Sequence, residues 1–111
     1  MRVDATAKYI RVSPRKVRLI LSEVQGKRVE EALVMLRFMP NPIALEVAKV
    51  VKSAAANAEH NYNLFARDLK VVSAIANEGV RMKRFKARSR GRPAPRVRRT
   101  SHITVVVEGE A

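Results

Sequence analysis

The chain has 111 residues, of which 47% are hydrophobic, so it is long enough for one domain with a modest core. Its 23 lysines and arginines outnumber its 10 acidic residues and give a net charge of +13; a compact domain at that charge repels itself, so we expect a polyanionic partner. The absence of cysteine excludes a disulfide scaffold and a thiolate zinc site, and it fits a reducing compartment.

The first predicted element is a strand over residues 2–12. Polar and apolar residues alternate along this segment, as they do in a strand with one buried face. The alternation predicts one face with Val3, Ala5, Ala7 and Tyr9, and a second face with Arg2, Asp4, Thr6 and Lys8.

A helix is predicted to begin at Pro14, because proline suits the first helical position and Ser13 before it is a favourable N-cap residue. Gly26 is the predicted stop signal at its other end. The expected buried stripe consists of Val17, Ile20, Leu21 and Val24.

Two more helices are predicted in the nearly neutral middle of the chain. The first covers residues 29–38, with Glu30 and Glu31 in its first turn, where the helix dipole favours acids. The segment Pro40-Asn41-Pro42 breaks the chain, and Asn41 is expected to cap the next helix before a loop at residues 61–63. The buried faces are predicted to contain Ala32, Leu33 and Leu36 in the first helix, and Ile43, Val47, Val50, Val51, Ala54 and Ala58 in the second.

Two further alternating segments predict strands, and together the elements predict an α+β fold. The first segment contains Leu69, Val71, Ser73 and Ile75, and the second contains Ile103, Val105 and Val107. We expect three helices packed on a small three-stranded antiparallel sheet, with a long extended β-hairpin between the last two strands. The chain 1–111 is then a single domain from which residues 79–100 project as the hairpin, with Gly91 near its tip. Each arm would extend roughly 33 Å beyond the body, and a two-stranded ribbon of this kind is only marginally stable in water without a surface to lie on.

The positive charge is concentrated in two segments. Residues 1–28 carry a net charge of +6, whereas residues 29–78 carry −1. Residues 79–100 contain ten basic and no acidic residues, eight of the ten being arginine. Because arginine makes bidentate contacts with phosphate and stacks on bases, this bias favours a structured RNA partner over diffuse membrane charge.

The start of the predicted first helix is a candidate phosphate site. Arg15, Lys16 and Arg18 lie at the positive end of the helix dipole, which costs free energy unless an anion binds there. A solvated basic turn is the alternative interpretation. The candidate RNA-binding residues of this first segment are Lys8, Arg11, Ser13, Arg15, Lys16, Arg18 and Lys27.

The late basic segment is the second candidate RNA-binding surface, with a disordered loop as the alternative. Its candidate RNA-binding residues are Arg81, Lys83, Arg84, Lys86, Arg96, Arg98 and Arg99, and its predicted tip consists of Arg88, Ser89, Arg90, Gly91, Arg92 and Pro93.

No pattern for catalysis, a metal or a cofactor is found in the sequence. The two histidines, His60 and His102, have no local carboxylate partner pattern, and His102 is expected to be a structural hydrogen-bonding group. The four glycines are too far apart for a phosphate-cradling loop. We therefore expect a protein that is not an enzyme and that binds no cofactor.

Three motifs resemble those of the bacterial-type large-subunit ribosomal proteins of the L-twenty-two family. They are residues 13–18 (SPRKVR), residues 53–61 (SAAANAEHN) and residues 99–105 (RTSHITV). Between the last two motifs, Lys83 and residues 88–92 (RSRGR) also match the family pattern, in the same order along the chain. The resemblance covers nearly the whole chain. It implies a globular body that binds large-subunit ribosomal RNA and aids its assembly, and a hairpin that lines the nascent-peptide exit tunnel.

The resemblance also implies two further partners, neighbouring ribosomal proteins and the nascent peptide. It implies that the chain is a monomer within the ribosome. No apolar signal region and no apolar run of roughly 20 residues is present, so we expect no membrane partner and a cytoplasmic ribosome or one in an organelle stroma or matrix. Two departures from the family pattern are Ala87, where a proline is expected, and residues 93–95 (PAP), where proline predicts that ladder pairing fails.

Two other functional classes fit the same charge pattern. A free-standing RNA chaperone or ribosome-assembly factor would need the same basic surfaces, and it would differ by dissociating from large subunits in moderate salt. A basic module that binds DNA or a membrane would prefer duplex DNA or anionic vesicles to ribosomal RNA.

Overall fold

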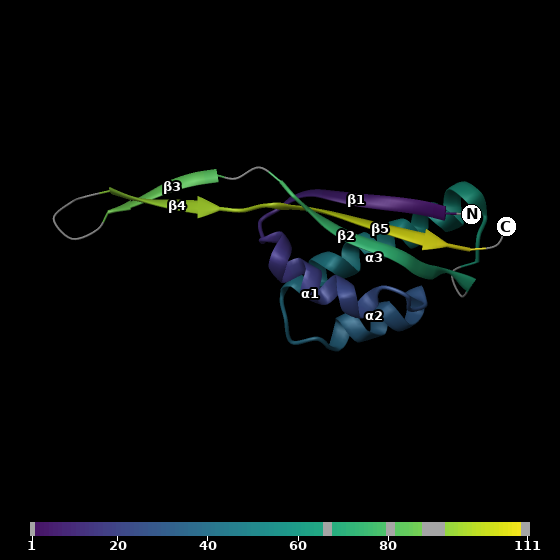
Figure 1. The fold of residues 1–111 in the computed structure, drawn as a ribbon. Coiled ribbons are helices and arrows are strands. Elements are labelled where there is room, and N and C mark those ends of the chain that lie inside the picture. The colour runs from purple at the N-terminus through teal and green to yellow at the C-terminus, as the bar shows by residue number, and fades with distance from the viewer. Residues whose placement is uncertain (1, 66–67, 80–81, 88–92, 110–111) are drawn as a thin grey trace.

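The computed structural model describes residues 2–65, 68–79, 82–87 and 93–109 (Figure 1). Over residues 82–87 and 93–98 the description covers the backbone alone. Three strands form an antiparallel sheet in the order β1-β5-β2, and two more form a separate antiparallel ribbon, β3-β4. The architecture is the predicted α+β fold with three helices. The elements in chain order are β1 (Arg2–Ile10), α1 (Pro14–Val24), α2 (Val29–Phe38), α3 (Ile43–Tyr62), β2 (Lys70–Glu78), β3 (Met82–Ala87), β4 (Pro93–Arg98) and β5 (Ser101–Glu108).

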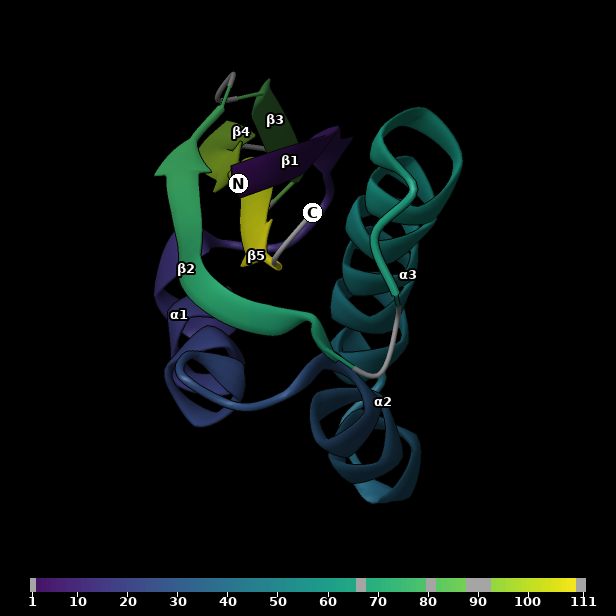
Figure 2. The ribbon, with the colours of Figure 1, turned by 90° about the vertical axis from the view of Figure 1, so that its right-hand side faces the viewer.

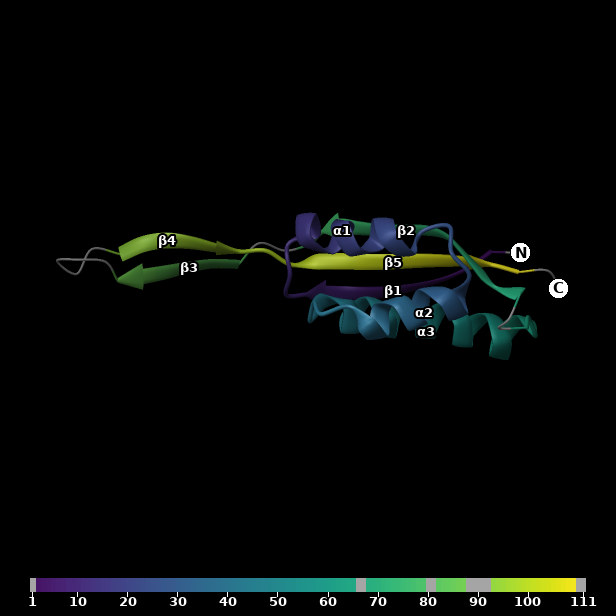
Figure 3. The ribbon, with the colours of Figure 1, turned by 90° about the horizontal axis from the view of Figure 1, so that it is seen from below.

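All three helices lie on one side of the three-stranded sheet. Helix α1 packs along β2 and α3 packs along β1, as the view from below shows (Figure 3). Helix α2 packs on α3 and lies farther from the sheet than the other two helices (Figures 1 and 2). The hydrophobic core therefore lies between the sheet and the layer of α1 and α3.

The central strand β5 supplies the most regular part of the core. Ile103, Val105 and Val107 are fully buried at alternate positions, as the alternation predicts, and Ser101 continues the same pattern. The stripes predicted for α1 and α3 also face the core, with the end positions such as Ile43 only partly buried. Burial of these side chains is the main source of the fold's stability, at roughly 25 cal/mol per Å² of apolar surface.

Two β-bulges break the predicted alternation. In β1 the pairing register shifts between Ala7 and Ile10, and in β2 it shifts between Val71 and Ser73. One extra residue moves every later side chain of the strand to the opposite face. The predicted alternation therefore fails after each bulge: Tyr9 does not share the face of Val3, and Ile75 does not share that of Val71, since their side chains are 61% and 49% exposed.

The helix ends follow local chemistry. Gly26 has a φ of +86°, a conformation that glycine adopts without strain, and its N–H donates to the Val71 carbonyl (2.8 Å). The N-cap residue of α3 is Pro42, one residue later than predicted, and the Asn41 side chain before it accepts a hydrogen bond from the Ile43 N–H (3.0 Å). Helix α3 continues to Tyr62, so the predicted loop at 61–63 begins two residues too early; left-handed Asn63 ends the helix instead.

The ribbon of β3 and β4 projects from one end of the body and makes the molecule long and narrow (Figure 1). The principal extents are 64 × 25 × 17 Å, and the radius of gyration is 16.9 Å, against roughly 13 Å for a compact chain of this length. The ribbon confirms that a hairpin lies between β2 and β5. The predicted tip at residues 88–92, and Arg81 on the incoming arm, lie outside the described residues.

The prediction that pairing fails at the prolines is wrong. Pro93 pairs with Ala87 and Pro95 pairs with Phe85 in a continuous ladder. The two prolines are two residues apart and so have the same orientation in β4. A two-stranded ribbon accepts proline at the alternate positions whose N–H would point outward.

The base of the hairpin requires a glycine at position 79. The Gly79 N–H donates to the Thr100 carbonyl (2.9 Å), and a Cβ at Gly79 would lie 2.5 Å from Thr100 Oγ1 and 3.2 Å from the His102 ring. Thr100 is only 3% exposed and cannot move aside freely. Gly79→Ala should therefore lower the free energy of unfolding by about 1–3 kcal/mol, measured by urea denaturation.

A double-mutant cycle provides the control for this prediction. In a Thr100→Ala background the nearest clashing atom is absent, so Gly79→Ala should cost clearly less than it does in the parent chain. Equal costs in both backgrounds would show that the close approach to Thr100 is not the cause.

Candidate nucleic-acid interface

Helix α1 begins with positive charge that no carboxylate of the described residues pairs with. Pro14 occupies the first helical position and the Ser13 carbonyl accepts hydrogen bonds from the N–H groups of Lys16 (3.2 Å) and Val17 (3.3 Å). The Ser13 side chain makes no capping hydrogen bond, and the first turn contains no acidic residue. Arg15 and Lys16 are exposed there, so an anion bound at this helix start would gain from the dipole, the backbone and both cations.

Arg18 has a structural contact that the sequence does not reveal. Its Nε and Nη2 donate to the Ala76 carbonyl at 3.1 and 2.8 Å. Ala76 lies in β2, an edge strand of the sheet, so the guanidinium joins α1 to that edge. The other two cations at the helix start, Arg15 and Lys16, have exposed side chains for which no hydrogen bond or ion pair is found among the described residues.

The junction between β1 and α1 is held by contacts with β5. Tyr9 adopts a φ of +59°, and its N–H donates to His102 Nδ1 (3.1 Å). The two rings meet edge to face with centroids 5.0 Å apart. The buried Ser101 hydroxyl donates to the Val12 carbonyl. These contacts confirm the expected structural role of His102, and they fix the position of the segment that carries Lys8 and Arg11.

The candidate residues of the first segment divide between the two ends of the body. Exposed Lys8, Arg11, Arg15 and Lys16 lie around the β1–α1 junction, at the end from which the hairpin projects (Figure 1). Arg99 is exposed between β4 and β5, at the base of the hairpin. Lys27 follows the other end of α1, about 16 Å along the helix, so it does not belong to this basic surface.

The pairing of β3 with β4 gives the hairpin two chemically different faces. Alternate positions of a ribbon belong to opposite faces. One set of positions contains four cations, and the register places Arg84 directly opposite Arg96. Like charges in such a pair destabilise a ribbon unless an anion lies between them. The sets are Met82, Arg84, Lys86, Ala94, Arg96 and Arg98 on one face, and Lys83, Phe85, Ala87, Pro93, Pro95 and Val97 on the other.

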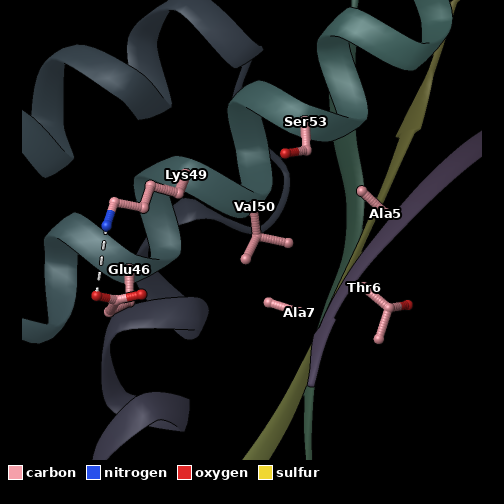
Figure 4. A pocket seen from close by; sticks show the side chains of 7 residues that line it. All are labelled: Ala5, Thr6, Ala7, Glu46, Lys49, Val50 and Ser53. Atoms are coloured by element: carbon pink, nitrogen blue, oxygen red, sulfur yellow. Dashed lines mark ion pairs between the residues drawn. The ribbon is translucent and has the colours of Figure 1, made fainter. Parts of the chain in front are cut away.

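A small pocket between α3 and β1 is not part of this interface. It has a volume of about 130 Å³ and includes Lys49, whose Nζ is 3.6 Å from a Glu46 carboxylate oxygen (Figure 4). The charge of Lys49 is thus already compensated. Within the described part of the chain, no three His, Cys, Asp or Glu side chains are close enough together to hold a metal ion.

Comparison with known proteins decides the family. A family model described as ribosomal protein L22p/L17e matches residues 5–108. A protein named large ribosomal subunit protein uL22 from Clostridium novyi (strain NT) is 50% identical over 111 residues, which is the full length of both chains. Proteins of the same name from Desulforamulus reducens and Clostridioides difficile are each 52% identical, over 96% and 97% of this chain and 95% and 97% of their own lengths.

The chain belongs to the ribosomal protein L22p/L17e family. The resemblance found in residues 13–18, 53–61 and 99–105 is thereby confirmed, and the match extends over the body and the hairpin of this L22p/L17e protein alike. Among the described residues, none of its helices is both long enough and apolar enough to cross a membrane.

Sequence reasoning missed two features of the basic end of this family member. The positive φ of Tyr9 has no signal in the sequence, because aromatic residues rarely adopt it. The contact of Arg18 with Ala76 joins residues 58 apart in the chain and depends on how α1 lies along β2. The contacts of Tyr9 hold the segment that carries Lys8 and Arg11, and the contact of Arg18 holds the start of α1 against β2.

Proposed function

We propose that the chain is a structural constituent of the large ribosomal subunit that binds large-subunit ribosomal RNA and aids its assembly. The observation that carries the proposal is the segregation of charge. A nearly neutral helical body carries exposed cations at the β1–α1 junction, and a ribbon with ten cations in its segment leaves from the same end. This arrangement suits a protein that is inserted between RNA segments.

The proposed mechanism is charge neutralisation with shape matching. Phosphates of neighbouring RNA segments repel one another, and cations placed between them remove that repulsion. At the helix start, Arg15 and Lys16 act together with backbone N–H groups on one phosphate. On the ribbon, Arg84, Arg96 and Arg98 can each hold a phosphate in a bidentate manner, which fixes orientation as well as charge.

The hairpin, proposed as residues 79–100, would line the nascent-peptide exit tunnel with a tip formed by residues 88–93. Its partners there would be ribosomal RNA, neighbouring ribosomal proteins and the nascent peptide. The long axis of 64 Å supports this role, because it gives the ribbon the reach to leave the body and enter RNA. We further propose that the chain acts as a single domain, with one copy in each ribosome, cytoplasmic or organellar. We propose no catalytic and no membrane-bound function for it.

Crosslinking in purified large subunits tests this function. A photoreactive group attached at a cysteine replacing Gly91 should crosslink to large-subunit RNA, and in translating ribosomes also to the nascent peptide. The protein should remain stoichiometric on the subunits after a moderate salt wash. Complete loss in that wash would favour the free-standing RNA chaperone or assembly factor, and crosslinks to surface proteins alone would contradict the tunnel position.

A further inference from the structure

A groove between α2 and α3 is not explained by RNA binding. It has a volume of about 380 Å³, and its lining residues belong to α2 and α3, which pack on each other. Figure 2 shows these two helices side by side. Leu36, which is 1% exposed, belongs to its floor. The lining residues are Leu33, Val34, Leu36, Arg37, Leu45, Ala48 and Lys52.

Large apolar side chains are exposed in and beside this groove. Val34 is 57% exposed and Leu45 63% exposed, and they lie on opposite helices. Phe38, one helical turn after Val34, is 78% exposed, the highest value among the eight exposed large apolar side chains of the described residues. Two of those eight line the groove and Phe38 lies one helical turn beyond them on α2, and such clustering marks an interaction surface more often than scattered exposure does.

The charges on the groove have one sign. Arg37 and Lys52 are its two charged lining residues, and no carboxylate of the described part of the chain lines it. Neither cation lies within ion-pair distance of a carboxylate among the described residues, in contrast to Lys49, which is paired with Glu46. An occupant with acidic groups on both sides of an apolar stripe would therefore match the groove.

We propose that this groove binds an acidic amphipathic helix of another protein. A helix docks on a pair of packed helices by inserting side chains spaced i, i+3, i+4 and i+7 between them. Helix α2 has ten residues and is thus about 15 Å long, which accommodates roughly three turns of a partner helix. The partner's apolar side chains would cover Val34 and Leu45, and its Asp or Glu side chains would pair with Arg37 and Lys52.

Other occupants fit the groove less well. A second copy of this chain would also carry a net charge of +13 and would be repelled. RNA is bound by many cations and by stacking on aromatic rings, whereas this groove is lined by aliphatic side chains and two cations, and Phe38 beside it is a single exposed ring. None of the groove residues is among the proposed RNA-binding residues, so the inference does not depend on the RNA-binding function proposed above.

Peptide binding to the full-length chain tests the inference. The probe is a fluorescein-labelled helical peptide of about 14 residues with leucines along one face and glutamates beside them. A scrambled peptide of the same composition, which has no continuous leucine face, serves as the first control. The first peptide should bind with a Kd at least about tenfold lower than that of the scrambled one, because only it can bury leucines in the groove.

A matched pair of chain variants separates apolar docking from charge attraction. Leu45→Lys removes an exposed groove residue and adds a cation, while Leu19→Lys makes the same change on α1, where Leu19 is 71% exposed and outside the groove. If the inference is correct, Leu45→Lys weakens peptide binding about tenfold or more despite the added positive charge, and Leu19→Lys does not weaken it. Far-UV circular dichroism checks that both variants retain their helices.

Three results would overturn the inference. Equal binding of the scrambled peptide, or stronger binding by both lysine variants, would show that the peptide responds to net charge alone. Displacement of the peptide by single-stranded oligouridylate, with amide shifts of α2 and α3 in the NMR spectrum, would assign the groove to RNA instead.

Discussion

Replacing Arg84, Lys86, Arg96 and Arg98 together by glutamine should weaken binding to large-subunit ribosomal RNA and make its salt dependence shallower. If about ten phosphates are contacted, the parent chain should show a log–log salt slope near −7 to −9, and four lost contacts should reduce the slope by about 3. The register places these four positions on one face of the ribbon. The slope is measured by filter binding or fluorescence anisotropy over a salt series.

The control for this prediction changes the same charge elsewhere. Replacing Arg37, Lys49, Lys52 and Lys70 by glutamine also lowers the net charge of +13 by four, but these residues lie outside the ribbon and the β1–α1 junction. This second variant should retain most of the slope and affinity. Equal losses in the two variants would mean that RNA responds to net charge, and the ribbon would not be the anchor.

Ile103→Ala should lower the free energy of unfolding by about 2–5 kcal/mol, a large part of the 5–15 kcal/mol typical of a domain. Ile103 is fully buried in the central strand β5, where it pairs with Ala7 of β1 and Ala76 of β2. Its truncation leaves a cavity in the core, and its two cross-strand partners are alanines, which are too short to fill it. Urea denaturation followed by circular dichroism measures the change, and the m-value should stay constant.

Val106→Ala is the matched control for this core substitution. Val106 lies in the same strand but on the opposite, half-buried face of the sheet, so its truncation should cost about 1 kcal/mol or less. Similar losses for both variants would contradict the view that the core lies only on the helical side of β5.

Most elements of the fold could be predicted because their signals are local. Pro14 and Gly26 define the ends of α1, and the helical stripes of α1 and α3 are buried as their spacing predicts. The boundaries of α2 at Val29 and Phe38 are those predicted. The errors lie in the strands, because a bulge depends on the partner strand, and one such shift exposes Ile75.

The candidate site could be predicted in its composition but only partly in its arrangement. The motifs and the two basic segments were sufficient to identify the family, and the family match confirms it. The sequence could not show that Arg18 binds the Ala76 carbonyl, or that Lys27 lies at the far end of α1 from Arg15. Both facts follow from the packing of α1 on β2.

The sequence by itself determined which residue types this protein has in each segment, and therefore its helices, its charge segregation and its family. These properties depend on neighbours within a few residues or on counts. The tertiary structure alone decided which of those residues meet, because such contacts depend on register and packing between distant segments. The register that sets Arg84 opposite Arg96 places four of the five cations of β3 and β4 on one face of the hairpin. The packing of α2 on α3 leaves Val34 and Leu45 exposed around an apolar groove.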